Sequence, residues 1–208
     1  AGLMAKRTII TIGREYGSGG REIGSRLAQE MGLAYYDKEL LVLAAKESGI
    51  AQELFEHNDE MPVNSLLYSL SVHPYSAGSL AGMQNMPLTQ KMFLALFEVI
   101  QKIARQEDCV IVGPCADYAL RSYPDCLNVF IHAPLPYRIE RVCKRNGLDT
   151  SEAKERILKT DKKRASYYNS YSDRKWGSLQ SYHLSFDSSL LGVESSVALI
   201  RQFVQSRL

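Results

Sequence analysis

The stretch TIITIGREYGSGGREIGSRLAQEMGL, residues 8–33, decides the fold. It begins with a β-branched run at residues 8–12 and continues as an amphipathic segment from Arg21. The loop between them contains four glycines: Gly13, Gly17, Gly19 and Gly20. A strand, a glycine loop and a helix are typical of phosphate binding, because glycines let backbone N–H groups turn toward the anion and the helix N-terminus adds partial positive charge. We therefore predict a phosphate-binding loop, and the alternative is a glycine-rich turn that binds no ligand.

The loop departs from the Walker A pattern, in which two glycines separated by four residues precede Lys and then Ser or Thr. Here Gly19 and Gly20 are followed by Arg21 and Glu22, so the loop has neither the lysine nor the hydroxyl that usually holds Mg²⁺. Arg21 is our candidate for the missing positive charge, with a planar fork in place of a point charge. The residues predicted to bind phosphate are Gly17, Ser18, Gly19, Gly20, Arg21 and Glu22.

Length and composition indicate one globular domain over residues 4–208, since 45% of the 208 residues are hydrophobic and 23% are charged. No hydrophobic segment is long enough to span a bilayer and no signal peptide is evident, so we expect a cytoplasmic protein with no membrane partner. The four cysteines form no CxxC pair and have no zinc spacing. We expect them to be reduced, and we assign no metal ligand to the protein.

The net charge is only +2, but residues 138–175 carry 12 Lys and Arg against 6 Asp and Glu. This basic segment indicates contact with a polyanion. The alternative is a solvated helix with charge pairs four residues apart, such as Glu152 and Arg156. The rest of the chain lacks the basicity usual for duplex binders, so we predict no nucleic-acid partner.

Helical and strand patterns alternate along the chain. Strands are expected at residues 8–12, 34–36, 109–112, 127–132 and 183–186. Helices are expected at residues 21–32, 37–46, 88–106, 137–145, 150–168 and 193–204, with a short one at 65–70 inside an otherwise unassigned segment. This order predicts an α/β fold with a parallel sheet and helices on both faces. Ligands bind such sheets at the carboxyl ends of the strands, where the glycine loop, Asp37 and residues 113–117 and 133–136 fall.

Several segments together resemble the cytidylate-kinase-like family of P-loop nucleoside monophosphate kinases. They are ITIGREYGSGGREIGSRLA, GLAYYDKELL, VIVGPCADYAL, VFIHAPLPYRIERV, TDKKRASYYNSYSDRKWG and the strand that ends at Asp187-Ser188-Ser189, in order over residues 8–189. The resemblance implies a P-loop NTPase-type three-layer sandwich around a five-stranded parallel sheet. It also implies an acceptor-binding region at residues 37–88 and a helical lid at residues 138–176. ATP with Mg²⁺ would be the donor and CMP or dCMP the acceptor. We expect small-molecule nucleotide substrates as partners, and a homodimer is compatible with the sequence.

The resemblance also suggests roles for particular residues. Phosphoryl transfer depends on alignment and charge neutralisation, which a basic lid can supply while it excludes water. The predicted catalytic residues are Arg21, Arg138, Arg141 and Arg164, and the predicted acceptor-binding residues are Asp37, Gly113, Asp117 and Asp161. Spacing places Arg138, Arg141 and Arg145 on one helix face, and Asp161 and Arg164 on another. A salt-bridged surface is the alternative for the lid arginines, and a helix cap is the alternative for Asp37.

The sequence departs from the family pattern in the glycine loop and again at Gly113-Pro114, where the family usually has Gly-Arg and the arginine is expected to contact the acceptor. Pro114 has neither a guanidinium nor a backbone donor. Either Arg121 or Arg14 substitutes, or the acceptor differs, or catalysis is weak. Three functions follow: a nucleoside monophosphate kinase, a nucleotide sensor with little turnover, or a kinase of another small metabolite.

Overall fold

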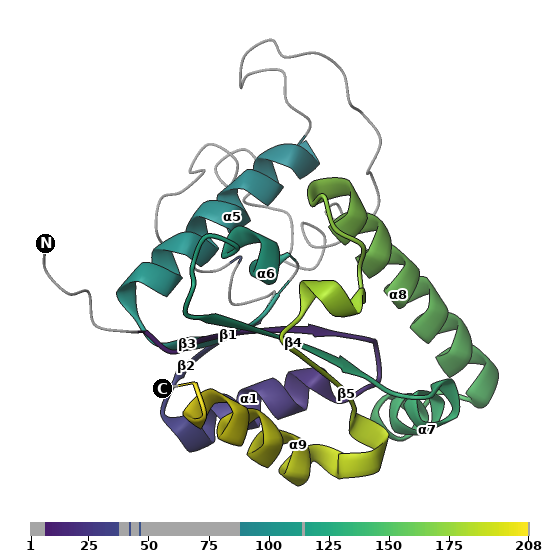
Figure 1. Cartoon of the computed structure of the whole chain (residues 1–208). Helices are drawn as coiled ribbons and strands as arrows, with labels where there is room; N and C mark the ends of the chain where they lie inside the picture. Colours follow the sequence, from purple (N-terminus) through teal and green to yellow (C-terminus); the bar gives the residue numbers. More distant parts are fainter. Residues whose placement is uncertain (1–6, 38–41, 43–45, 47–87, 114, 208) are drawn as a thin grey trace, which may run out of the picture.

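The computed structural model describes residues 7–37, 42, 46, 88–113 and 115–207. The expected helices at 37–46 and 65–70, the acceptor-binding region at 37–88 and Pro114 lie wholly or mostly outside the described residues. Five parallel strands form one sheet in the order β2-β3-β1-β4-β5 (Figure 1). The strands are β1 (Ile9–Arg14), β2 (Ala34–Asp37), β3 (Cys109–Val112), β4 (Cys126–His132) and β5 (Leu184–Asp187).

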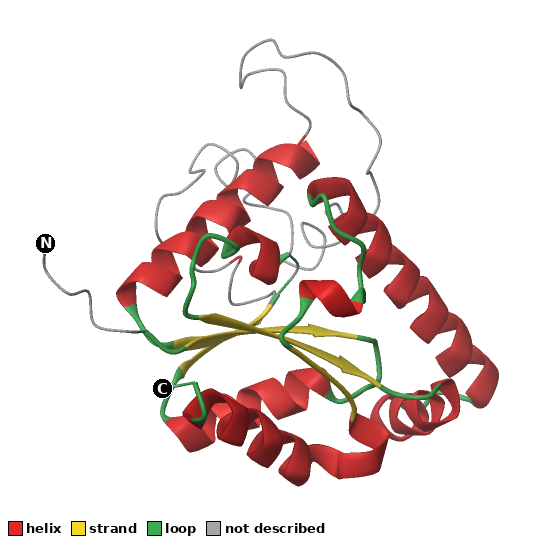
Figure 2. Cartoon of the chain, in the orientation of Figure 1, coloured by secondary structure: helices red, strands yellow, loops and turns green. Residues whose placement is uncertain are grey.

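Helices cover both faces of this sheet, which confirms the predicted three-layer α/β fold (Figure 2). The helices are α1 (Gly20–Met31), α5 (Leu88–Gln106), α6 (Ala116–Ala119), α7 (Leu135–Asn146), α8 (Thr150–Tyr171), η2 (Leu179–Ser181) and α9 (Ser188–Gln205). Helices α1 and α9 pack on one face, α5 and α6 on the other, and α7 and α8 pack against each other beside the sheet. No helix in the described part of the chain is long and apolar enough to cross a membrane.

The apolar residues of the strands form one core on each face of the sheet, because successive side chains of a strand point to opposite faces. Ile10 and Ile12 of β1 are buried against α1 and α9, together with Val110 and Val112 of β3. Ile9 faces the other way, into the core formed with α5 and α6. β1 is therefore buried on both faces over Ile9–Ile12, and its partly buried carboxyl end leads into the glycine loop.

The expected element boundaries are close to the observed ones, with two kinds of difference. The closing helix begins at Ser188 rather than at residue 193, because a kink at Gly192 (φ 69°) joins a first turn to the expected helix. The short elements α6 and η2 were not expected, since three or four residues are too few to show helical periodicity. The helix expected from residue 150 is confirmed, and Asp149 caps it through a capping box with Glu152.

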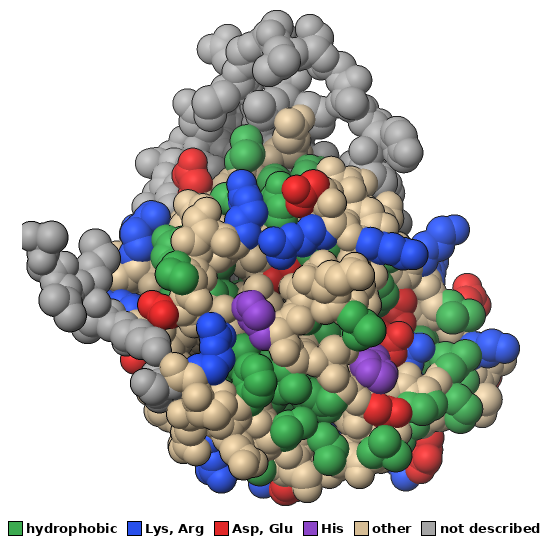
Figure 3. All heavy atoms as spheres, in the orientation of Figure 1, with side chains coloured by type: hydrophobic (Ala, Val, Ile, Leu, Met, Phe, Trp, Pro, Cys, Tyr) green, Lys and Arg blue, Asp and Glu red, His purple; other side chains and the backbone are tan. Residues whose placement is uncertain are grey.

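The region predicted as a lid contains α7 and α8, which share a small apolar core. Val142, Ala153 and Ile157 are fully buried there, and Tyr16 of the glycine loop packs against them. The two helices therefore contact the loop directly, while the division into subdomains stays a prediction. Figure 3 shows Lys and Arg side chains across the face that carries α5, α6 and α8, with Asp and Glu among them.

Candidate active site

The glycine loop joins β1 to α1 through two left-handed residues, Gly17 (φ 85°) and Gly19 (φ 86°). Ser18 lies buried between them, and its amide and hydroxyl both donate to the carbonyl of Glu15, at 3.3 and 2.9 Å. The hydroxyl of Ser188 donates to the Ser18 carbonyl at 2.6 Å, which ties the loop to the start of α9. The loop is thus a compact turn, fixed at both ends, that leads into the N-terminus of α1.

Helix α7 packs directly on this loop at Gly17. A Cβ at this position would lie 3.0 Å from the backbone oxygen of Arg138 and 3.1 Å from Cγ2 of Val142. Gly17 is therefore required twice, for its positive φ and for the close approach of α7. The glycine pattern of the sequence thus reflects helix packing as well as backbone conformation.

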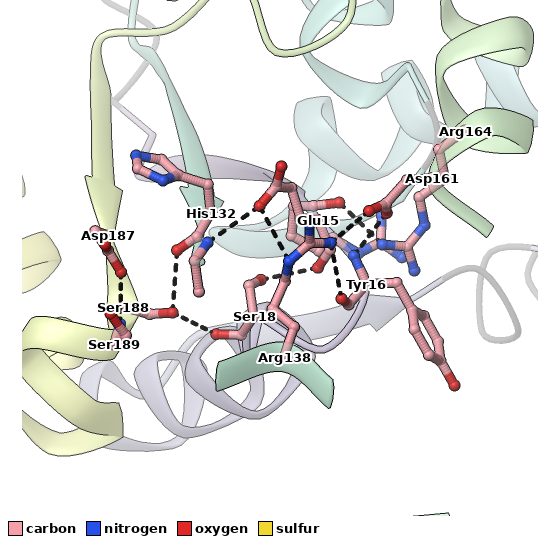
Figure 4. A network of polar contacts seen from close by, with 12 residues as sticks. Glu15, Tyr16, Ser18, His132, Arg138, Asp161, Arg164, Asp187, Ser188 and Ser189 are labelled. Atoms are coloured by element: carbon pink, nitrogen blue, oxygen red, sulfur yellow. Dashed lines mark hydrogen bonds and ion pairs between the residues drawn. The ribbon is translucent and has the colours of Figure 1, made fainter. Parts of the chain in front are cut away.

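Arg138 lies at the centre of a buried polar network that links the loop to α7 and α8 (Figure 4). Its Nη1 pairs with Oδ2 of Asp161 and donates to the Tyr16 carbonyl at 3.3 Å, and its Nε lies 3.5 Å from Oε2 of Glu15. Oδ1 of Asp161 accepts from the Tyr16 amide at 2.7 Å, and Glu15 accepts from the Ala133 amide at 3.1 Å. The network therefore joins the loop, the segment after β4, and both lid helices.

A cleft of about 690 Å³ opens beside this network, at the carboxyl ends of β1 and β2. The glycine loop and the first turn of α1 form one wall. The charged residues that line it are Arg14, Arg21, Arg141, Arg145 and Arg164, and the carboxylates Glu15, Glu22 and Asp37. Five guanidiniums against three carboxylates make this cleft positively charged, as a site for a polyanion requires.

Two of these arginines are paired with carboxylates in the cleft wall. Nη2 of Arg21 lies 2.7 Å from Oδ2 of Asp37, and Nη2 of Arg141 lies 2.7 Å from Oε2 of Glu22. The Arg21 side chain is 60% exposed whereas that of Asp37 is 9% exposed, so the pair spans the cleft from its rim to its floor.

Arg14 and Arg164 differ from Arg21 and Arg141 in their partners. Nη1 of Arg164 donates to the backbone oxygen of Arg14 at 2.9 Å, and no carboxylate of the described residues lies within 4.0 Å of either guanidinium. Burial lowers the pKa of both groups, and the charge of Arg164 lowers the pKa of Arg14 further. Both remain protonated, since arginine does not lose its proton in proteins. Two half-buried cations held close together favour an anion between them.

The residues predicted to bind the acceptor are not gathered in one place. Asp37 lines the cleft, but Asp161 belongs to the Arg138 network and neither Gly113 nor Asp117 lies on the cleft wall. Asp117 is buried in α6, where its Oδ2 accepts from the Tyr168 hydroxyl at 2.6 Å. Burial raises the pKa of the Asp117 carboxyl. The predicted acceptor roles of these residues stay predictions.

The predicted phosphate-binding residues Gly17, Gly19, Gly20, Arg21 and Glu22 all line the cleft, whereas Ser18 is buried behind it. Of the predicted catalytic arginines, Arg141 and Arg164 line the cleft with Arg21, and Arg138 does not. Sequence reasoning gave no role to Glu15, whose link to Arg138 has no signal in the sequence. No cluster of three or more His, Cys, Asp or Glu suited to a metal is found in the described ranges.

A model of the cytidylate kinase-like family matches residues 9–190. The chain belongs to this family. Two curated relatives are named cytidylate kinase. The cytidylate kinase of Ignicoccus hospitalis is 24% identical over 95% of this chain and 99% of its own length. The cytidylate kinase of Methanopyrus kandleri is 24% identical over 93% of this chain and 91% of its own. The family predicted from the ordered motifs is therefore confirmed.

Solved structures with the same fold agree. An uncharacterized protein from Eubacterium ventriosum has a TM-score of 0.73 and 27% identity, with 97% of this chain and 99% of that chain covered. The shikimate kinase of Bacteroides thetaiotaomicron has a TM-score of 0.56 and 15% identity, with 95% and 98% covered, and shows the fold alone. By family and fold, this chain is a kinase-like phosphotransferase.

Proposed function

We propose that this family member transfers a phosphoryl group from ATP to a nucleoside monophosphate, and that the acceptor is CMP or dCMP. The observation that carries the proposal is the positively charged cleft between the glycine loop and α7. The arginines of β1, α1, α7 and α8 converge on it, although they are far apart in the sequence. The choice of a cytidine nucleotide is supported by the names of the two curated relatives.

In this proposal the donor phosphates bind at the glycine loop. Helix α1 begins at Gly20 beside the cleft, so its N-terminus would offer partial positive charge and backbone N–H groups to the phosphates. Arg21 and Glu22 follow in the first turn and line the same wall. Mg²⁺ bound to the nucleotide would add positive charge at the transferred phosphate, and the oxygens of Asp37 and Glu22 are the hard ligands it prefers.

The lid arginines supply charge where it develops during transfer. Arg141, Arg145 and Arg164 line the cleft from α7 and α8, and charge stabilisation by fixed guanidiniums is the main requirement of phosphoryl transfer. We assign a different part to Arg138 and Asp161. Their mutual ion pair and their hydrogen bonds to Tyr16 position the loop beneath the lid helices rather than contact the nucleotide.

A second function rests on one observation about the loop. Gly20 and Arg21 stand where a Walker A loop has its lysine and its hydroxyl, so a nucleotide-binding protein with little turnover is the main alternative. A kinase of another small metabolite is the third, since residues 37–88, where the acceptor would bind, lie mostly outside the described part of the chain.

A coupled assay with ATP, Mg²⁺ and each nucleoside monophosphate separates these functions. We expect turnover with CMP or dCMP to exceed turnover with AMP, GMP and UMP. Arg141→Ala should lower kcat/KM by about tenfold or more, because it removes a charge from the cleft. The matched control is Lys144→Ala, an exposed residue of the same helix that pairs with Glu140 outside the cleft.

Each other result selects a different function. Tight ATP binding by calorimetry without turnover of any acceptor would favour the sensor. Turnover only with a non-nucleotide acceptor would favour the metabolite kinase. Failure to bind ATP at all would contradict all three.

A further inference from the structure

The stem of the Arg14 side chain occupies the space beside the first residue of α1. A Cβ built on Gly20 would lie 2.6 Å from Cβ and 2.9 Å from Cγ of Arg14. Side-chain carbons do not approach so closely, and the stem atoms of Arg14 are fixed by the end of β1. Residue 20 must therefore be glycine as long as residue 14 is any residue other than glycine.

The same two positions stand out in the sequence of the loop. The Walker A pattern has a glycine, four residues, a second glycine and then the lysine that reaches the β- and γ-phosphates. When its second glycine is placed at Gly19, its first glycine falls at Arg14 and its lysine at Gly20. Relative to the Walker A pattern, the glycine and the cationic residue have thus exchanged places. The structure gives the reason: a side chain at position 14 leaves no room for one at position 20.

The environment of Arg14 is that of a group that binds an anion. Its half-buried side chain lines the cleft next to the glycine loop, and its backbone oxygen holds the guanidinium of Arg164. Among the described residues, no carboxylate lies within 4.0 Å of its own guanidinium. Arginine also suits phosphate, because its planar fork can bind two oxygens at once.

We propose that the guanidinium of Arg14 binds the β- and γ-phosphates of the nucleoside triphosphate and replaces the lysine of the standard loop. This inference rests on the proposed function and names the group that holds the donor. Arg21 takes a different part in it. The Arg21 side chain is 60% exposed and pairs with the buried carboxylate of Asp37, so its charge is shared.

The test is to exchange the two residues. Arg14→Gly should weaken binding of ATP with Mg²⁺ by about tenfold or more, measured by calorimetry. Gly20→Lys alone should bind ATP no better than the unchanged protein and melt at a lower temperature, because its Cβ meets the Arg14 stem. The double variant Arg14→Gly with Gly20→Lys removes the clash and supplies a cation from α1, so it should bind ATP more tightly than Arg14→Gly. A purely structural role for Arg14 would give no such rescue.

Arg14→Met provides a second measurement that does not depend on the folding of the double variant. It keeps the stem and removes the charge, so ATP binding should weaken by about tenfold while the melting temperature changes little. The matched control is Arg105→Met, because the Arg105 guanidinium donates to the Tyr123 hydroxyl at 3.4 Å, away from the cleft wall.

The outcomes keep this inference separate from the proposed function. Unchanged ATP affinity of Arg14→Met overturns the role of Arg14 and leaves the proposed function standing. A folded double variant that binds ATP no better than Arg14→Gly overturns it as well. If the unchanged protein does not bind ATP, the proposed function fails, and this inference fails with it.

Discussion

Two groups of arginines contact the glycine loop, and they differ in what neutralises them. Arg138 is buried between Asp161 and Glu15 and donates to the Tyr16 carbonyl, so the protein itself satisfies its charge. Arg14 and Arg164 lie together in the cleft wall, where no carboxylate of the described residues is within 4.0 Å of their guanidiniums. The same residue type thus serves two purposes in one region of the fold.

The difference shows how to separate structural from functional arginines. A buried cation that has its counterions within the protein contributes to the folded state, and removing it leaves those counterions unpaired. A pair of neighbouring cations with no carboxylate at ion-pair distance raises the energy of the folded protein and gains from binding an anion. Substitutions in the first group should therefore reduce stability, and substitutions in the second should reduce ligand affinity.

The largest effect is expected at Arg138. Arg138→Met should lower the free energy of unfolding by about 3 kcal/mol, because Asp161 and Glu15, both only partly exposed, would lose their shared cation. Urea unfolding measures this value. Arg145→Met, on an exposed residue of the same helix, is the control and should change stability by less than about 0.5 kcal/mol. Equal effects of the two substitutions would refute the structural role of Arg138.

The contact between α7 and the loop can be tested at Gly17. Gly17→Ala should cost about 2 kcal/mol, because alanine is strained at φ 85° and its Cβ meets the Arg138 carbonyl. Gly147→Ala is the matched control, since Gly147 also has a positive φ (65°) but a Cβ there would meet nothing within 4 Å. The difference between the two free energies of unfolding measures the packing of α7 on the loop, and a difference near zero would mean that the backbone strain alone matters.

Arg164 should behave in the opposite way to Arg138. Arg164→Met should weaken ATP binding about tenfold, which corresponds to about 1.4 kcal/mol. The free energy of unfolding should change by less than about 1 kcal/mol, because the lost hydrogen bond to Arg14 is offset by relief of the repulsion between the two cations. Calorimetry and urea unfolding on the same variant check both values. A large loss of stability with unchanged affinity would place Arg164 in the structural group.

The smallest effect is expected at Asp117, a buried carboxylate whose nearest cation, Arg174, is 3.9 Å away. Because burial raises the pKa of Asp117 in the folded protein, its contribution to stability is complete below the pKa of the unfolded chain and is lost as pH rises through the folded pKa. Asp117→Asn keeps an oxygen to accept from Tyr168 and removes this pH dependence. At pH 7 the variant should equal or exceed the original stability by less than about 1 kcal/mol, measured by urea unfolding.

Urea unfolding of the original protein and of Asp117→Asn at pH 4 and at pH 7 gives the decisive comparison. The original protein should lose more stability from pH 4 to pH 7 than Asp117→Asn does, because the variant retains every other titrating group and so serves as the reference for them. An identical pH dependence would mean that the Asp117 carboxyl titrates alike in the folded and unfolded states.

Much of the fold could be predicted because its signals are local. The β-branched run of β1 predicted a strand, and the periodic apolar residues of α5 predicted a helix with the observed bounds. The alternation of strands and helices predicted the parallel sheet. The helix α6 escaped prediction because four residues carry no period. The family was predicted for a similar reason, since its motifs are short stretches that keep their order along the chain.

The site was predicted only in part, because its residues are distant in the sequence. Arg138 and Arg141 are three residues apart and were expected to share a face toward the phosphates, yet α7 packs on Gly17 and buries Arg138 while Arg141 stays in the cleft. Asp161 and Arg164 stay close, as their spacing predicts, but their hydrogen bonds differ: Asp161 accepts from the Tyr16 amide, whereas Arg164 donates to the Arg14 carbonyl. A helix pattern gives the angle between side chains but not the surface that each one meets.

By itself, the sequence determined the alternation of strands and helices, the glycine loop and the family, because backbone preferences and motif order are properties of neighbouring residues. The tertiary structure alone decided which arginines have protein counterions and which face the cleft. It also decided that the stem of Arg14 fills the space beside Gly20. These choices depend on how α7 and α8 approach the end of β1, and such contacts between distant segments are fixed only when the whole core is packed.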